Sequence, residues 1–99
     1  MKTNQYTEIF KALADETRVK VIQILTKENK CACQILEQLS ISQSTLSHHM
    51  SILTSSNLVL SKKEGKWVHY RLNQELFETI GLFFEKTEIV DTVCVSCGV

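Results

Sequence analysis

Residues 42–56 read SQSTLSHHMSILTSS and have the apolar spacing of an amphipathic helix. Leu46, Met50 and Leu53 recur at intervals of four and three, so they fall on one face of a helix with 3.6 residues per turn. Ser42 can accept a hydrogen bond from a free N–H of the first turn, and Asn57 can end the helix in a left-handed conformation. We therefore predict a helix with one buried and one exposed face.

The exposed face of this helix has short polar side chains that suit contacts with base edges in DNA. These side chains are Gln43, Ser44, Thr45, Ser47 and His48. His49 lies between Leu46 and Leu53 on the inward side, so we expect it to be packed and hydrogen-bonded rather than a metal ligand.

The preceding segment, residues 31–39, carries Ile35, Leu36 and Leu39 at helical spacing. Residues 40–42 leave room for a short turn before the next helix. Two helices joined in this way have the plan of a helix-turn-helix, which we place at residues 31–56.

A pattern of period two follows in residues 58–72, where Val68, Tyr70 and Leu72 alternate with polar neighbours. Glu64-Gly65 is expected to turn the chain, which makes this segment a two-stranded β-hairpin with a basic tip. The lysines of the tip are Lys62, Lys63 and Lys66. A hairpin placed directly after a helix-turn-helix is a wing, whose lysines can neutralise phosphates of the DNA backbone. Trp67 can pack under a lysine stem.

The two end segments have apolar stripes that suit association. Residues 1–13 carry Tyr6, Ile9, Phe10 and Leu13, and residues 74–91 carry Leu76, Phe77, Ile80, Phe83 and Phe84. These are more large apolar side chains than a 99-residue core readily covers, so we predict that both segments form the interface of a two-fold homodimer. Between them, Asp15 can cap a helix whose core face contains Val19, Val21, Ile22 and Leu25.

The 99 residues contain no proline and no linker, which predicts a single domain over residues 1–99. The fold class is mainly α (α+β), a winged helix-turn-helix. The net charge is zero but polarised, because residues 61–71 have a net charge of +3 and residues 72–99 a net charge of −4. A basic tip beside an acidic tail fits one face directed toward phosphate. There is no apolar run of membrane-spanning length and no signal-peptide core, so we expect a cytoplasmic protein without a membrane partner.

The four cysteines form two closely spaced pairs, Cys31 with Cys33 and Cys94 with Cys97. In a reducing compartment, such pairs favour metal binding or redox sensing over structural disulfides. Thiolates prefer soft ions such as As(III), Sb(III), Cd(II) or Pb(II), with three ligands suiting arsenic and four suiting cadmium. On a regular helix Cys31 and Cys33 would point about 200° apart. We therefore expect an ion to unwind the first helical turn and so to displace the recognition helix.

Four stretches together resemble the ArsR/SmtB family of metal-responsive repressors, and within it the arsenical-resistance operon repressors. They are LADETR at residues 13–18, CAC at 31–33, SQSTLSHHM at 42–50 and GKWVHYRL at 65–72. The resemblance spans roughly residues 6–73, most of the chain. It implies a homodimeric repressor, not an enzyme, that holds double-stranded operator DNA and releases it when an inducing ion binds.

The resemblance also implies roles for single residues. Gln43, Ser44, Ser47 and His48 would contact the major groove, Lys62, Lys63 and Lys66 would lie on the wing, and Cys31 and Cys33 would bind the inducer. In some arsenic repressors a third cysteine lies three residues after the second, but Leu36 occupies that position here. Cys94 or Cys97 is the natural substitute. The family's zinc site on the last helix uses histidine, and this segment has none.

Three alternatives remain open at this point. A Cd(II)- or Pb(II)-responsive repressor would use all four thiolates. A redox or persulfide sensor would form a disulfide on oxidation. A thiol oxidoreductase or metal carrier would have no DNA role, although the C-terminal CxxC motif lacks the βαβ context of a thioredoxin-like site.

Overall fold

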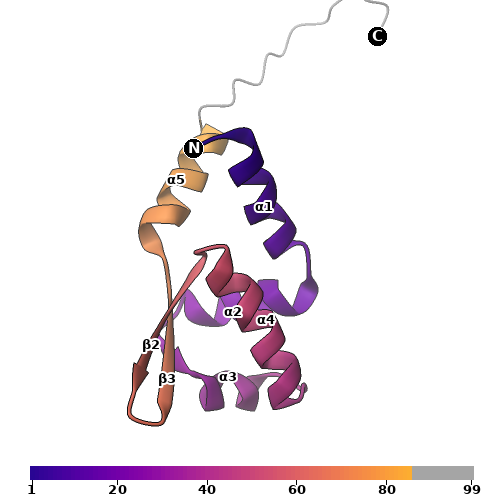
Figure 1. Ribbon diagram of the computed structural model, residues 1–99, viewed down its shortest axis with the longest axis vertical. Coiled ribbons are helices and arrows are strands. Elements are labelled where there is room, and N and C mark those ends of the chain that lie inside the picture. Colours follow the sequence, from indigo (N-terminus) through magenta and orange to yellow (C-terminus); the bar gives the residue numbers. More distant parts are fainter. Residues whose placement is uncertain (86–99) are drawn as a thin grey trace, which may run out of the picture.

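The computed structural model describes residues 1–85, which form five helices and a small antiparallel sheet at one edge of the molecule (Figure 1). The elements are α1 (Thr3–Leu13), α2 (Glu16–Leu25), β1 (Lys30–Cys31), α3 (Ala32–Gln38), α4 (Gln43–Ser55), β2 (Val59–Glu64), β3 (Trp67–Leu72) and α5 (Gln74–Glu85). This order confirms the predicted winged helix-turn-helix. Cys94, Cys97 and residues 86–91 of the predicted C-terminal segment lie outside the described residues.

The predicted helix ends at Asp15, Ser42 and Asn57 are confirmed, and Asn73 caps α5 in the same way. Caps form where Asp15 Oδ2 accepts from Arg18 N at 3.0 Å, Ser42 Oγ from Thr45 N at 3.1 Å, and Asn73 Oδ1 from Leu76 N at 3.3 Å. After α4, Asn57 has φ 64°, the left-handed conformation that asparagine tolerates better than most residues. Short polar side chains therefore set where three helices begin and how α4 ends.

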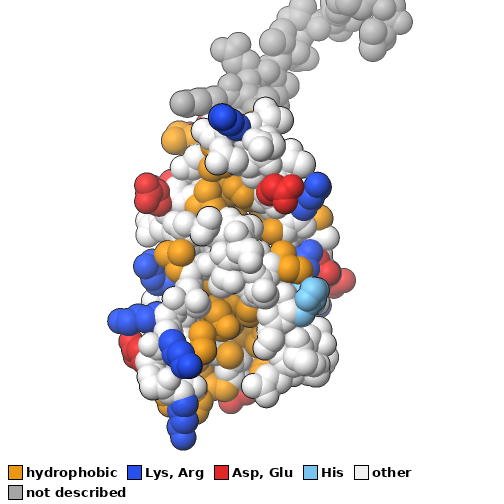
Figure 2. Space-filling view, viewed as in Figure 1, with side chains coloured by type: hydrophobic (Ala, Val, Ile, Leu, Met, Phe, Trp, Pro, Cys, Tyr) orange, Lys and Arg blue, Asp and Glu red, His pale blue; other side chains and the backbone are white. Residues whose placement is uncertain are grey.

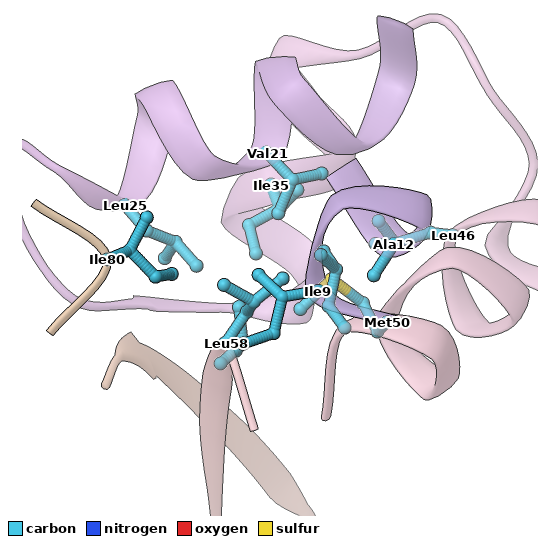
Figure 3. Packing of buried hydrophobic residues seen from close by; sticks show 11 residues of the cluster. Ile9, Ala12, Val21, Leu25, Ile35, Leu46, Met50, Leu58 and Ile80 are labelled. Atoms are coloured by element: carbon cyan, nitrogen blue, oxygen red, sulfur yellow. The ribbon is translucent and has the colours of Figure 1, made fainter. Parts of the chain in front are cut away.

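The core draws on α1, α2, α3, α4, β2 and α5, as Figure 3 shows. Its buried residues are Ile9, Ala12, Val21, Leu25, Ile35, Leu46, Met50, Leu53, Leu58, Val59 and Ile80. The expectation that Val19 faces the core is wrong, because its residue surface is 40% exposed. Val21 and Leu25 set the buried face of α2, and Val19 lies about 200° around the helix from Val21.

The sheet has the order β1-β3-β2, with both pairings antiparallel. The predicted hairpin is present, but Glu64 pairs with Trp67, so Gly65 and Lys66 form its loop. Gly65 has φ +62°, which glycine adopts without steric cost. The third strand, β1, was not predicted, because two residues are too short to show a period of two.

Helices α1 and α5 converge at one end of the molecule, away from the hairpin (Figure 1). Aromatic rings join them within one chain, with centroids 4.4 Å apart for Tyr6 and Phe83 and 5.9 Å apart for Phe10 and Phe84. Phe84 is nevertheless 60% exposed and Leu82 is 48% exposed, so this end retains an apolar surface. In residues 1–85, no helix has the length and apolar character to span a membrane.

Candidate nucleic-acid interface and cysteine pair

Helix α4 is held by its apolar side and presents a polar side to solvent. Leu46, Met50 and Leu53 are at most 2% exposed, whereas all five predicted base-reading side chains, at positions 43, 44, 45, 47 and 48, are exposed. A helix fixed in this way can enter the major groove of B-DNA, which is about 12 Å wide.

The five polar side chains of α4 differ in whether they make hydrogen bonds within the protein. Ser42 Oγ lies 2.8 Å from Thr45 Oγ1 and 3.1 Å from Ser44 Oγ, so these hydroxyls also belong to the helix cap. Within residues 1–85, the side chains of Gln43 and Ser47 make no hydrogen bond to the protein. Gln43 and Ser47 are thus available to an external partner without loss of an internal contact.

The wing presents its lysines to solvent. Figure 2 shows Lys and Arg side chains gathered over the hairpin, at the lower left of the view. Lys62 pairs with Glu64 at 3.2 Å, with both side chains more than half exposed. Lys66 Nζ lies over the ring of Trp67, 6.0 Å from the ring centroid. Lys63 is exposed and has no ion pair among residues 1–85.

The polar face of α4 and the basic hairpin therefore lie at the same end of the molecule. In Figure 1 the hairpin loop and the end of α4 that follows α3 both lie away from α1 and α5. This arrangement can place α4 against base edges and the hairpin against the adjoining phosphates.

Cys31 and Cys33 meet at the start of α3. Cys31 is the last residue of β1 and the N-cap of α3, with extended dihedrals of φ −82° and ψ 162°. Its N–H donates to Gln34 Oε1 at 3.0 Å. Cys31 is buried and Cys33 is exposed, and the two thiols shift each other's pKa.

The expectation that these cysteines point apart is wrong, because it placed both on a regular helix. Cys31 precedes the helix with an extended backbone, and its sulfur accepts a hydrogen bond from the Gln34 N–H of the first turn. The separation of about 200° that two residues would have on a regular helix therefore does not apply to this pair.

The interaction between the two thiols shifts their pKa values in opposite directions. The hydrogen bond from Cys33, followed by that from the Gln34 N–H, lowers the pKa of Cys31. The same thiol contact, followed by burial, raises the pKa of Cys33. The two shifts make the Cys31 thiol the more acidic of the pair.

A third ligand is not found close to this pair in the described part of the chain. Residues 1–85 contain no cluster of three or more His, Cys, Asp or Glu side chains that could hold a metal. A third thiolate would have to come from Cys94 or Cys97, which lie beyond those residues, or from another chain.

Two features of the site were missed at the level of sequence. Strand β1 pairs Cys31 with His69 of β3, which joins the cysteine pair to the wing. Arg18 Nη1 lies 3.1 Å from Nδ1 of His49, which joins α2 to α4. The expected packing of His49 is confirmed, since its side chain is 12% exposed.

Residues 15–61 match a known protein family described as bacterial regulatory protein, arsR family. The chain is 41% identical over 70 residues to the arsenical resistance operon repressor of Escherichia coli, covering 70% of this chain and 60% of that protein. It is 34% identical over 98 residues to the repressor of the same name from Staphylococcus xylosus, covering 99% and 91%. It is also 39% identical over 69 residues to a cadmium resistance transcriptional regulatory protein (CadC homolog) of Staphylococcus aureus, covering 69% and 57%.

Solved structures share the fold. HlyU from Vibrio cholerae superposes with a TM-score of 0.71 at 30% identity, covering 86% of this chain and 96% of that one. A homodimeric winged helix-turn-helix DNA-binding domain, Mb0332 from Mycobacterium bovis, gives a TM-score of 0.69 at 23% identity, covering 84% and 81%.

Proposed function

Because the chain belongs to the arsR family of bacterial regulatory proteins, we propose that it is a DNA-binding repressor of an arsenic-resistance operon. Membership of this family makes it a transcriptional regulator and not an enzyme. The observation that carries the arsenic assignment is the placement of Cys31 and Cys33 together at the start of α3, the first helix of the helix-turn-helix.

The proposed DNA contacts come from two elements. Helix α4 enters the major groove and offers Gln43, Ser44, Thr45, Ser47 and His48 to base edges and phosphates. The wing offers Lys62, Lys63 and Lys66 to the backbone. Exposure of all eight side chains supports this division.

The proposed assembly is a homodimer through α1 and α5. The exposed Leu82, Phe83 and Phe84 would be covered by a second copy, which removes apolar surface from water. A two-fold pair of α4 helices reads half-sites about 34–36 Å apart, or a whole turn more.

The proposed inducer is arsenite or antimonite, bound by Cys31, Cys33 and either Cys94 or Cys97. Three thiols replace three hydroxyl groups of As(OH)3, which gives three As–S bonds and three water molecules, with no change of oxidation state. The lowered pKa of Cys31 favours the first exchange, because the thiolate is the nucleophile.

We propose that ion binding at the cysteines is coupled to DNA release through strand β1, and not through unwinding of a helix. Lys30 pairs with Tyr70 and Cys31 with His69. A displacement of Cys31 would therefore also move β3, which is the central strand of the sheet and one of the two strands of the wing. The same residue caps α3, the first helix of the helix-turn-helix. An ion that favours a displaced β1 would therefore shift both DNA-contacting elements. Moving occupancy from 99:1 to 1:99 needs about 5.5 kcal/mol of differential binding.

A Cd(II)- or Pb(II)-responsive repressor is the second candidate. It is supported by the likeness to the cadmium resistance regulator of Staphylococcus aureus and by the four cysteines, which could supply a tetrahedral site.

Fluorescence anisotropy of the protein's own promoter fragment tests these proposals. Fully reduced protein should bind the fragment, and one equivalent of arsenite per subunit should release it, with reversal by a competing dithiol. Release by cadmium but not by arsenite would favour the second candidate, and release by polysulfide without an ion would favour a redox sensor. Failure to bind the fragment would contradict the repressor assignment.

A further inference from the structure

The end of α1, the start of α2 and the middle of α4 meet around one side chain, Arg18. Its Nε donates to the carbonyl oxygen of Ala12 at 2.5 Å, and its Nη1 lies 3.1 Å from Nδ1 of His49. Its backbone N–H donates to Asp15 Oδ2 at 3.0 Å. One guanidinium group thus joins the last turn of α1 to the middle of α4.

The chemistry of these groups fixes the direction of the contact. A guanidinium group has only donors, so Nδ1 of His49 accepts and the ring proton lies on Nε2. Asp15 Oδ2 is 3.8 Å from Nδ1, which is too long for a hydrogen bond. The His49 side chain is 12% exposed, so water competes little for Nδ1.

A hydrogen bond can fix the rotation of α4, whereas the apolar face of this helix cannot. Burial of Leu46, Met50 and Leu53 holds α4 to the core, but apolar contacts are non-directional and permit small rotations or slides. The hydrogen bond from Arg18 sets the rotation of α4 relative to α1 and α2. His49 directly follows Ser47 and His48, so any rotation it permits reaches the proposed base contacts at once.

We propose that Arg18 and His49 are positioning residues for operator recognition, which hold α4 in register with α1. They act through Ser47 and His48 and touch no DNA themselves. The inference rests on the proposed function as a DNA-binding repressor. It predicts that loss of the contact lowers the preference for operator over unrelated DNA and leaves non-specific binding in place.

Four variants of the full chain separate this role from simple stabilisation. Replacement of His49 by Leu removes the acceptor. His49→Asn places an amide oxygen near the position of Nδ1, whereas His49→Gln, its matched control, places it near Nε2. Arg18→Lys keeps the charge but cannot donate to Ala12 and His49 from one planar group.

The measurement is the affinity for the operator and for an unrelated duplex of equal length, by anisotropy at fixed salt. Thermal denaturation of each variant shows that it is folded. For His49→Leu, His49→Gln and Arg18→Lys, the ratio of the two affinities should fall about tenfold or more. Affinity for the unrelated duplex should stay within about twofold, because phosphate contacts dominate it. His49→Asn should keep most of the wild-type ratio.

Combining Arg18→Lys with His49→Leu should lower the ratio little further than either change alone, because both remove one contact. An unchanged ratio in folded Arg18→Lys and His49→Gln would overturn the inference, as would equal losses in His49→Asn and His49→Gln. A wild-type protein that does not distinguish operator from unrelated duplex would overturn the proposed function and this inference with it.

Discussion

Cys31 combines two roles at the scale of a single residue. It is the last residue of β1 and the N-cap of α3, and its sulfur accepts a hydrogen bond from the Gln34 N–H. Serine is among the preferred N-cap residues and keeps nearly the same shape. Substitution by serine therefore removes a soft ligand while preserving the local structure.

We expect Cys31→Ser to bind the operator within about twofold of the wild-type affinity, because the helix cap is retained. Arsenite should no longer release this variant, since an alcohol is a poor ligand for a thiophilic ion. Anisotropy with and without arsenite measures both properties. Release of the variant from the operator at the arsenite concentration that releases the wild-type protein would show that Cys31 is not a ligand.

Ser47 and His48 test the proposed base-reading face. Replacement of either by alanine should weaken operator binding by about 1–3 kcal/mol if it makes a good base contact. Ser51, exposed farther along α4, provides a matched control, and Ser51→Ala should leave the affinity unchanged. Titrations of one operator fragment with the three variants give the comparison. Equal affinities throughout would remove this face from the DNA interface.

Several residue environments could be predicted from sequence because they depend on near neighbours. The caps at Asp15, Ser42 and Asn73 need only a helix start three residues away, and His49 follows from its place between two core leucines. The partner of His49 could not be predicted. Arg18 is 31 positions away, and its approach depends on how α2 crosses α4.

At the scale of elements, helix α2 depends on the Asp15 carboxylate at its N-terminus. The pKa of Asp15 is lowered, chiefly because its carboxylate accepts a hydrogen bond from the Arg18 backbone N–H. A lowered pKa means that its stabilisation is complete above the ordinary aspartate range and is lost as the pH falls through the folded-state value. Substitution of Asp15 by asparagine would keep a capping oxygen without a titrating group.

Asp15→Asn should therefore unfold with a flatter dependence on pH below about pH 4 than wild type. Thermal denaturation monitored by circular dichroism at a series of pH values measures this dependence. Identical curves for the two proteins would show that the Asp15 charge contributes nothing to the folded state.

The proposed contribution of the wing to DNA binding is electrostatic. Replacement of Lys63 by alanine should reduce the slope of log affinity against log salt by about one phosphate contact. Lys20 is an exposed lysine on α2 outside the proposed interface, so Lys20→Ala should leave the slope unchanged. Operator titrations over a range of salt concentrations provide the slopes. Equal changes for both variants would mean that the wing has no special place in DNA binding.

The elements themselves follow largely from periodicity, whereas their exact ends do not. Spacing of apolar residues located the five helices and the hairpin, because each buries one face over several turns or alternations. Strand β1 is too short for that signal. The sequence predicts Cys31 inside α3, whereas Cys31 is its N-cap, so the separation of the two cysteines expected from helical geometry does not apply.

At the scale of the whole molecule, the two ends of the chain's fold have different surfaces. The hairpin and the start of α4 lie at one end, and α1 and α5, with exposed phenylalanines, lie at the other (Figure 1). This separation allows a dimer to form at one end while DNA binds at the other.

A charge at Phe84 should disrupt this proposed dimer, because burial of an unpaired carboxylate is costly. We expect Phe84→Glu to sediment as a monomer and to lose most of its operator affinity, since it could engage one half-site at a time. Val19→Glu, which also adds a charge at an exposed apolar position, is the control and should remain a dimer. Sedimentation of Phe84→Glu as a dimer would place the interface elsewhere.

One titration tests directly whether thiolate capture of arsenic releases DNA. Arsenite is added to the reduced protein on its operator, and release is followed by anisotropy while the remaining reactive thiols are counted in parallel. We predict that release is complete at one arsenite per subunit and coincides with the loss of three thiols, including Cys31 and Cys33. Loss of these thiols while the operator stays bound, or release with both still reactive, would contradict the proposed mechanism.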